Sequence, residues 1–217
     1  MTIDTKIMKT NKNPKITPIR CCKLFPKTKV TRSMWYFDRL RQFYCIGLKK
    51  IISDIQITPD CDVRFYKKAS TLNIMENSIF YDIVNGHMAA HKYSVVRIKI
   101  LSETTSHTNI MIINNHSKQI EWFDSCVMSN VRQYRHLYVL LRKYLHNYHI
   151  NIVNRNDRIQ ETGDRFCQSW IYYYVYQRLY KNKTPKDILN KIMSKDKHQR
   201  RTIILKFFHK IASFVYA

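Results

Sequence analysis

Acidic residues are scarce in this sequence. Aspartate and glutamate number 15 among 217 residues, whereas lysine and arginine number 38. The formal net charge is therefore +23, and the sequence pI is about 9.9. A field of this strength draws a protein towards polyanions, so we expect a nucleic acid among its partners.

Long apolar runs are absent as well. The longest, such as residues 171–176, are far shorter than the roughly 20 apolar residues that a membrane-spanning helix needs. The N-terminus is charged and lacks the apolar region of a signal peptide. We therefore expect a soluble, intracellular protein without a membrane span.

The cysteines lack the spacing of a metal site or of a disulfide framework. They form no CxxC pair, and no histidine stands near them at zinc-finger spacing. The six positions are Cys21, Cys22, Cys45, Cys61, Cys126 and Cys167. We expect reduced thiols, no bound metal and no cofactor.

Apolar residues are abundant and predict a folded protein. The hydrophobic content is 45%, with 13% aromatic residues, which suffices for one domain with a sizeable core. Residues 1–31 hold three prolines, scattered lysines and one acid, Asp4, so we expect a basic arm there. Residues 32–217 should form a single domain, with no internal repeat.

Helical patterns occur at several places along this domain. An apolar stripe runs from Ser33, a suitable N-cap, to about residue 52. Steps of three and four across residues 131–148 predict an amphipathic helix that covers one face of a sheet. Thr184, followed by a proline and then an acid, resembles a helix start, and two terminal helices are predicted at about 185–195 and 198–215.

The middle of the chain predicts strands. Residues 93–101 alternate apolar with polar over their second half, as a half-buried strand does. Residues 108–113 and 119–123 are rich in β-formers and flank strong turn chemistry at 114–118. Connections this short join antiparallel neighbours, and a short apolar run at 150–153 is a candidate for a further strand.

Residues 54–91 carry mixed signals. Residues 63–66 look like a short strand, whereas residues 72–84 fit either a helix or irregular structure. The whole pattern predicts an α+β fold with a central mixed, mainly antiparallel sheet flanked by helices.

Cys167 is the strongest candidate for a reactive group. It follows a polar turn and begins a predicted helix that runs to about residue 182. A helix N-terminus carries partial positive charge and free N–H groups, which lower the pKa of a thiol placed there and favour the nucleophilic thiolate. A cysteine at a helix start can equally be a small buried hydrophobe, so other residues must decide.

A thiolate peptidase also needs a base, a group that orients the base, and donors for an oxyanion. His107 opens one strand and Asp124 ends the next, so the hairpin brings both to one edge of the sheet. We expect Asp124 to accept a hydrogen bond from Nδ1 of His107, leaving Nε2 to face the thiol. Gln160, seven residues before Cys167, is within reach of an oxyanion beside the Cys167 backbone N–H.

Each of these three residues has a plainer interpretation. His107 can be a partly exposed loop residue, Asp124 can cap the next turn, and Gln160 can be a surface glutamine. Other histidines are alternatives to His107, but none combines a following β-run with an acid at the end of the paired strand. These are His87, His91, His116, His136, His146 and His149.

The blocks within residues 92–182 resemble a known clan of cysteine peptidases, which includes the SUMO-processing proteases and the adenovirus maturation protease. They are most similar to the versions encoded by large cytoplasmic DNA viruses. Residues 107–113, residues 120–125, Gln160 and residues 163–170 follow the order of the family's His, Asp, Gln and Cys blocks. The resemblance implies a papain-like core of the adenain and SUMO-protease type.

The same resemblance implies the role of each residue: His107 the general base, Asp124 its orienting partner, Gln160 the oxyanion-hole donor and Cys167 the nucleophile. The sequence departs from the family next to these residues. Thr108 and Gln168 stand where the SUMO proteases usually have tryptophan and glycine, and Gln160 lies one residue further from the cysteine than is usual.

The resemblance implies a viral thiol endopeptidase that cuts virion precursor proteins after small residues such as glycine, in the host cytoplasm at assembly sites or in the virion. One alternative is a deubiquitinase or deSUMOylase-like isopeptidase that acts on ubiquitin-like tails. Another is a catalytically inert, basic virion protein that binds nucleic acid.

The excess of positive charge lies at the two ends of the chain. Residues 1–50 hold thirteen lysines and arginines against two acids, and residues 178–210 hold eleven against two. Neither end contains a module that reads sequence. We expect DNA or RNA binding without sequence preference, through phosphate contacts away from the catalytic cleft.

Overall fold

The computed structural model describes residues 29–57, 61–64, 90–101, 106–126, 139, 141–143, 145–154, 158–160 and 166–217. The chain divides into two compact units, residues 1–36 and residues 37–217. The sheet and the candidate site both belong to the second unit, which is the one described below.

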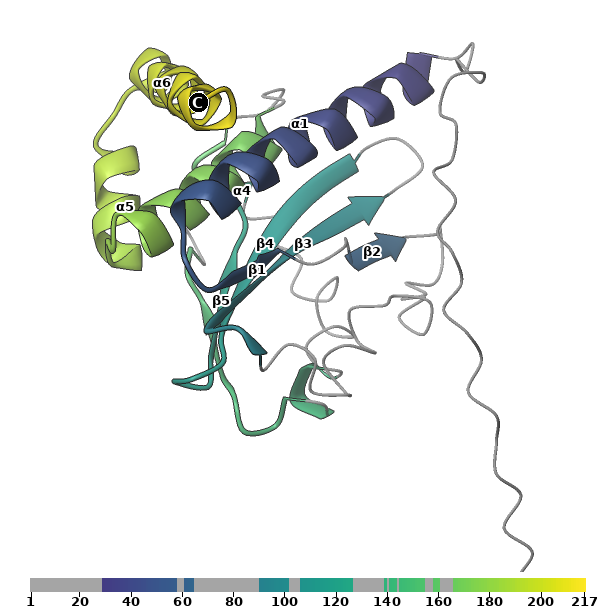
Figure 1. Ribbon diagram of the computed structural model, residues 1–217, viewed down its shortest axis with the longest axis vertical. Helices are drawn as coiled ribbons and strands as arrows, with labels where there is room; N and C mark the ends of the chain where they lie inside the picture. The colour runs from purple at the N-terminus through teal and green to yellow at the C-terminus, as the bar shows by residue number, and fades with distance from the viewer. Residues whose placement is uncertain are drawn as a thin grey trace, which may run out of the picture. The chain divides into compact units, whose positions relative to one another are not determined.

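The described residues form a six-stranded mixed sheet with the order β1-β3-β4-β5-β6, in which β2 also pairs with β3 (Figure 1). The strands are β1 (Ile55–Ile57), β2 (Cys61–Arg64), β3 (Tyr93–Leu101), β4 (Ser106–Asn114), β5 (Gln119–Phe123) and β6 (His149–Ile152). Strand β4 pairs antiparallel with both β3 and β5. Strands β1 and β2 pair in parallel with β3, and β6 pairs in parallel with β5. The predicted α+β class and the three successive antiparallel strands are confirmed.

The turn between β4 and β5 sets their register. Asn114 Oδ1 accepts hydrogen bonds from the backbone N–H groups of His116 (3.1 Å) and Ser117 (3.0 Å), as an asparagine does when it closes a turn. Asn114 pairs with Gln119, and the ladder continues to Ile110 opposite Phe123. This register decides which residues meet at the far end of the hairpin.

The described helices are α1 (Lys29–Ile51), α4 (Cys167–Val175), η2 (Tyr176–Tyr180), α5 (Pro185–Met193) and α6 (Lys197–Val215). Helix α1 begins four residues before Ser33, so Ser33 is not its N-cap, and residues 29–31, at the end of the predicted arm, are helical. No proline follows Pro26 in this stretch, so nothing stops the helix from extending towards the N-terminus.

Helix α4 packs on β4 along one face of the sheet (Figure 1). All nine of its residues are buried, because α1 and α6 cover the sides that the sheet leaves open. The ring of Tyr44 on α1 stacks with Tyr172 of α4 at 5.2 Å and with Phe207 of α6 at 5.3 Å. Phe123 of β5 stacks on Tyr174 at 4.3 Å, which ties α4 to the sheet.

Helices α1 and α6 approach closely at Gly47. A Cβ atom at this position would lie 2.6 Å from Cγ2 of Ile211, which is closer than side chains pack. A glycine is therefore needed for this helix contact.

Strand β3 is buried on both faces, which corrects the prediction of a half-buried strand. Residues 94–98 are all buried, and Arg97 is 1% exposed. The alternation of apolar and polar residues was misleading, because the polar side chain of Arg97 does not face water. Its guanidinium Nη2 lies 3.5 Å from Oδ1 of Asp38 on α1, so the buried charge is paired.

The predicted helix after Cys167 is confirmed, although its last turn is a π-helix with Lys181 N–H donating to the Tyr176 carbonyl. The predicted terminal helices match α5 and α6. Thr184 Oγ1 caps α5 by accepting from the Asp187 N–H at 3.1 Å, and Asp196 forms a capping box at α6. None of the described helices is long and apolar enough to cross a membrane.

The strand predicted at 150–153 is confirmed as β6, and β2 matches the first half of the strand predicted at 63–66. Residues 72–84 and most of residues 131–148, where an amphipathic helix is predicted, lie outside the described residues. Three of the apolar residues that predict this helix, Leu141, Leu145 and Tyr148, are described and are buried.

Candidate active site

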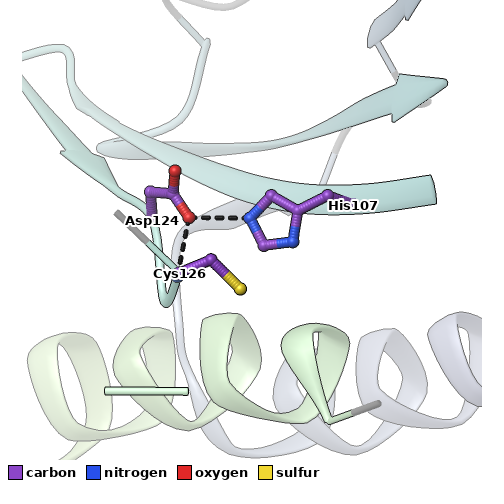
Figure 2. A group of neighbouring side chains, drawn as sticks. All are labelled: His107, Asp124 and Cys126. Carbon is purple, nitrogen blue, oxygen red and sulfur yellow. Dashed lines mark hydrogen bonds and ion pairs between the residues drawn. The ribbon is translucent and has the colours of Figure 1, made fainter. Parts of the chain in front are cut away.

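The hairpin register brings His107 beside the residues that follow β5. If the β4–β5 pairing continued past Phe123, residue 126 would lie opposite residue 107, and residue 124 opposite residue 109. Positions 107, 124 and 126 therefore share one face of the sheet, with Asp124 diagonal to His107. The structure places all three side chains together (Figure 2).

His107 is hydrogen-bonded to Asp124, but through the nitrogen that the sequence analysis did not predict. His107 Nε2 lies 2.7 Å from Asp124 Oδ1, and both side chains are buried. Diagonal neighbours lie about 7–8 Å apart at their Cα atoms, so only the far nitrogen of the ring reaches a short aspartate. Nδ1 is thus the nitrogen that is left for the thiol, which reverses the predicted orientation of the ring.

Cys167 is the first residue of α4 and is buried. The residue before it, Phe166, makes no side-chain cap, so the helix N-terminus presents its N–H groups and partial positive charge beside the thiol. Burial alone raises the pKa of Cys167, but hydrogen bonds from His107 and from the side chain and backbone of Thr108 outweigh burial and lower it.

His107 has the opposite shift. Burial disfavours the charged ring, yet hydrogen bonds with Asp124, Cys126 and Cys167 prevail and raise the pKa of His107 to about 12. A raised histidine pKa and a lowered cysteine pKa stabilise the same state, an imidazolium beside a thiolate. The arrangement therefore favours the nucleophilic thiolate over the thiol.

Gln160 lies beside the same cluster and is 3% exposed. Its Oε1 accepts hydrogen bonds from Ser125 Oγ (2.9 Å) and Cys126 Sγ (3.2 Å), which fixes the orientation of the side-chain amide. The backbone N–H groups of Ile159 and Gln160 both donate to the Ser125 carbonyl, at 3.0 and 2.8 Å. Arg200 of α6 donates to the Ile159 carbonyl at 3.2 Å and holds the segment from outside.

Three further residues of the site were not anticipated. Asn154 holds the backbone of Asp124, because its Oδ1 accepts from the Asp124 N–H at 3.1 Å and its Nδ2 donates to the Asp124 carbonyl. The Cys126 N–H donates to Asp124 Oδ1 at 2.9 Å, and Thr108 contacts the Cys167 thiol. Cys126 could have been predicted from the hairpin register. No sequence pattern indicates Asn154, because it follows β6 and is not part of the hairpin.

The site also contains a group of possible metal ligands. One ligand atom from each of His107, Asp124 and Cys126 lies within 4.8 Å of the others. Cysteine spacing did not predict this group, because its members come together through strand register rather than through a short sequence motif.

The alternative histidines lie elsewhere. His91 Nδ1 lies 3.4 Å from Asp54 Oδ1, and both side chains are substantially exposed. His116, His146 and His149 are exposed. His87 and His136 lie outside the described residues.

No protein-family model matches this sequence, and a search of curated proteins finds no match. Among solved structures, the chain is similar to the Chlamydia trachomatis effector protein ChlaDUB1, with a TM-score of 0.49 and 15% identity over 82% of this chain and 72% of that one. It is also similar to a de-sumoylating protease, with a TM-score of 0.40 and 14% identity over 83% and 76% of the two chains.

Proposed function

We propose that the protein is a cysteine peptidase in which Cys167 is the nucleophile, His107 the general acid and base, Asp124 the residue that orients His107, and Gln160 an oxyanion donor. One observation carries this proposal. His107 is hydrogen-bonded to Asp124 at 2.7 Å and also to the Cys167 thiol, whose pKa is lowered at a helix N-terminus. These are the parts that acyl transfer to a thiolate requires.

In this mechanism the Cys167 thiolate attacks the scissile carbonyl carbon, and the carbonyl oxygen becomes an oxyanion. The Cys167 backbone N–H and the Gln160 amide stabilise the oxyanion. His107 gives its Nδ1 proton to the leaving amine, and a thioester remains. His107 then takes a proton from water, which attacks the thioester and releases the acid and the Cys167 thiolate. Asp124 stays ionised and holds Nε2 throughout.

For the substrate, we propose a peptide or isopeptide bond that follows a small residue such as glycine. The motif resemblance to viral members of the clan supports virion precursor proteins, cut at assembly sites in the host cytoplasm or in the virion. The resemblance to the SUMO-processing proteases supports ubiquitin-like tails. Incubation with candidate capsid precursors and with ubiquitin-like precursors, followed by mass spectrometry of the products, separates the two substrate classes.

The decisive variant is Cys167→Ala, which should abolish turnover while the protein stays folded. Its matched control is Cys45→Ala, since Cys45 is a partly buried thiol on α1 that contacts Tyr172 and takes no part in the site. Cysteine peptidase activity is refuted if Cys167→Ala retains the cleavage pattern of the wild type. A peptide electrophile that labels all thiols equally would favour the inert basic protein instead.

We further propose that the surface of η2, α5 and α6 binds DNA or RNA without sequence preference. Nine basic side chains there are exposed: Lys181, Lys183, Lys186, Lys191, Lys195, Lys197, Arg201, Lys206 and Lys210. Phosphate contacts of this kind release counterions, so affinity should fall steeply with salt.

The test is a fluorescence titration of unrelated duplexes across a salt series. We expect similar affinities and a negative log–log slope of several units. The triple variant Lys195→Ala, Lys197→Ala, Arg201→Ala should weaken binding, and removal of residues 1–31 tests the N-terminal basic segment separately. A flat response to salt contradicts this proposal and leaves the peptidase assignment unaffected.

A further inference from the structure

Cys126 is a second thiol in the site, and hydrolysis does not require it. Its Sγ donates to Gln160 Oε1 at 3.2 Å and is hydrogen-bonded to His107, while its backbone N–H donates to Asp124. The residue is half-buried. Figure 2 shows its side chain converging with those of His107 and Asp124.

The three side chains form a donor set that suits a soft divalent cation. Zinc is bound in proteins by imidazole nitrogen, thiolate sulfur and carboxylate oxygen, and a catalytic type of site supplies three protein ligands with one open position. A neutral imidazole, a thiolate and a carboxylate together carry two negative charges, which balance one divalent cation. The thiolate selects Zn²⁺ over Mg²⁺ or Ca²⁺, which prefer oxygen ligands.

We propose that His107, Asp124 and Cys126 form a Zn²⁺-binding site that overlaps the catalytic residues, so that bound Zn²⁺ blocks hydrolysis. The ion takes the place of the proton between His107 Nε2 and Asp124 Oδ1 and also displaces the thiol proton of Cys126. Binding therefore releases protons, and it removes the hydrogen bond that orients the ring.

The geometry requires a modest rearrangement. Ligand atoms of a tetrahedral zinc site lie about 3.3 to 3.8 Å apart, given bond lengths of roughly 2.0 to 2.3 Å. In the protein, His107 Nε2 and Asp124 Oδ1 are 2.7 Å apart, and all three ligand atoms lie within 4.8 Å of one another. Side-chain movements on the order of 1 Å convert the present cluster into a zinc site. Cys126 sits on the short segment after β5, where such a movement disturbs no strand pairing.

Binding of the ion does not depend on the proposed activity, whereas inhibition rests on it. The first experiment therefore measures binding with Co²⁺, which reports a thiolate ligand through a sulfur-to-cobalt charge-transfer band. The full-length, metal-free protein is titrated under anaerobic conditions. The double variant Cys21→Ser, Cys22→Ser and the variants Cys45→Ser and Cys61→Ser remove the other thiols that could bind the probe.

The decisive variants are Cys126→Ser and Cys167→Ala. We expect the charge-transfer band in the wild type and in Cys167→Ala, because Cys126 supplies the sulfur. Cys126→Ser keeps a donor for Gln160 but should lose the band and at least tenfold in affinity. A band that persists in Cys126→Ser and vanishes in Cys167→Ala overturns the proposal. Circular dichroism melts of both variants establish that they are folded.

The second experiment measures hydrolysis against Zn²⁺ concentration, with each variant normalised to its own zinc-free rate. The wild type should lose activity and recover it with EDTA, and Mg²⁺ should have no effect. Cys126→Ser should need at least ten times more Zn²⁺ for the same loss. Equal sensitivity of the two proteins refutes the overlap. If the wild type hydrolyses nothing but Co²⁺ binding depends on Cys126, the peptidase proposal fails and the metal site stands.

Discussion

Two carboxylates three residues apart, Glu121 on β5 and Asp124 just after it, each bind a basic side chain in a mostly buried setting. Glu121 accepts from Arg178 Nε at 2.8 Å, from Arg178 Nη2 and from the Tyr174 hydroxyl at 2.7 Å. Asp124 accepts from His107 Nε2 at 2.7 Å and from the Cys126 N–H. The two pairs are alike in distance, although the pair of His107 and Asp124 is the more buried, and they differ in what the partner can do with its protons.

Arginine does not release a proton in a protein, and the pair with Glu121 raises the pKa of Arg178 further. The bidentate contact with Glu121 therefore fastens η2 to β5 and has no acid–base role. Histidine can give up a proton at one nitrogen while it keeps the bond at the other. Proton exchange at the partner, rather than the strength of the pair, separates the proposed reactive cluster from the structural one.

The sharpest test of this difference is Asp124→Asn, which removes one charge and leaves the shape unchanged. Without the carboxylate, the largest opposition to burial of the charged ring is lost, so the pKa of His107 should fall and the thiolate should lose part of its stabilisation. We expect kcat/KM to fall by about 10²- to 10⁴-fold, the usual contribution of acid–base catalysis. A loss no larger than that of Glu121→Gln would contradict the assignment of Asp124.

Gln160→Ala should have the next largest effect. Loss of one oxyanion donor typically lowers kcat by about 10²- to 10³-fold with little change in KM. Ser125→Ala is the matched control, because it removes a hydrogen bond to Gln160 Oε1 and leaves the amide donor in place. Equal losses of kcat in the two variants would show that Gln160 acts only by packing against Ser125.

A pH profile of Cys167 alkylation tests whether His107 lowers the pKa of this thiol. Hydrogen bonds from His107 lower the pKa of Cys167 below its ordinary value of 9.0, so iodoacetamide should modify the wild-type thiol rapidly at neutral pH. In His107→Ala, burial dominates and raises the pKa of Cys167. The rate should then drop about tenfold for each pH unit below that pKa. Parallel profiles for the two proteins would rule out the ion pair.

The smallest effect on turnover is expected for Glu121→Gln. Its charged hydrogen bonds to Arg178 and Tyr174 are lost, which should lower the free energy of unfolding by about 1.5 to 3 kcal/mol, as measured by urea denaturation. Hydrolysis per folded molecule should match the wild type, since no group of the site changes. A large loss of kcat in a fully folded sample would show that the two clusters are coupled.

The parts of the fold that follow from local chemistry were predictable. Turn-forming residues at 114–118 determine the hairpin, and the hairpin brings His107 to Asp124. The same register, if continued past Phe123, would bring residue 126 opposite His107, so Cys126 could have been predicted and was missed. Capping at Thr184 likewise identified α5.

The parts that depend on distant packing were not predictable. Arg97 resembles a solvent-facing residue of an alternating strand, whereas in the fold it is buried and its charge is paired with Asp38 on α1. The nitrogen that His107 offers to Asp124 depends on the diagonal offset of two side chains, which no sequence pattern records. Asn154 follows β6, which pairs in parallel with β5. It therefore lies beside Asp124 although the two residues are far apart in sequence.

The contact between Gly47 and Ile211 links the surface helices to the site. Helix α6, which carries Ile211, also carries Arg200, and Arg200 holds the segment of Gln160 through the Ile159 carbonyl. Any side chain at position 47 meets Cγ2 of Ile211, so the Ile211 side chain or α6 must shift unless position 211 becomes smaller. Positions 47 and 211 should therefore change together among relatives that keep this helix pair, as a substitution pattern set by spacing rather than by catalysis.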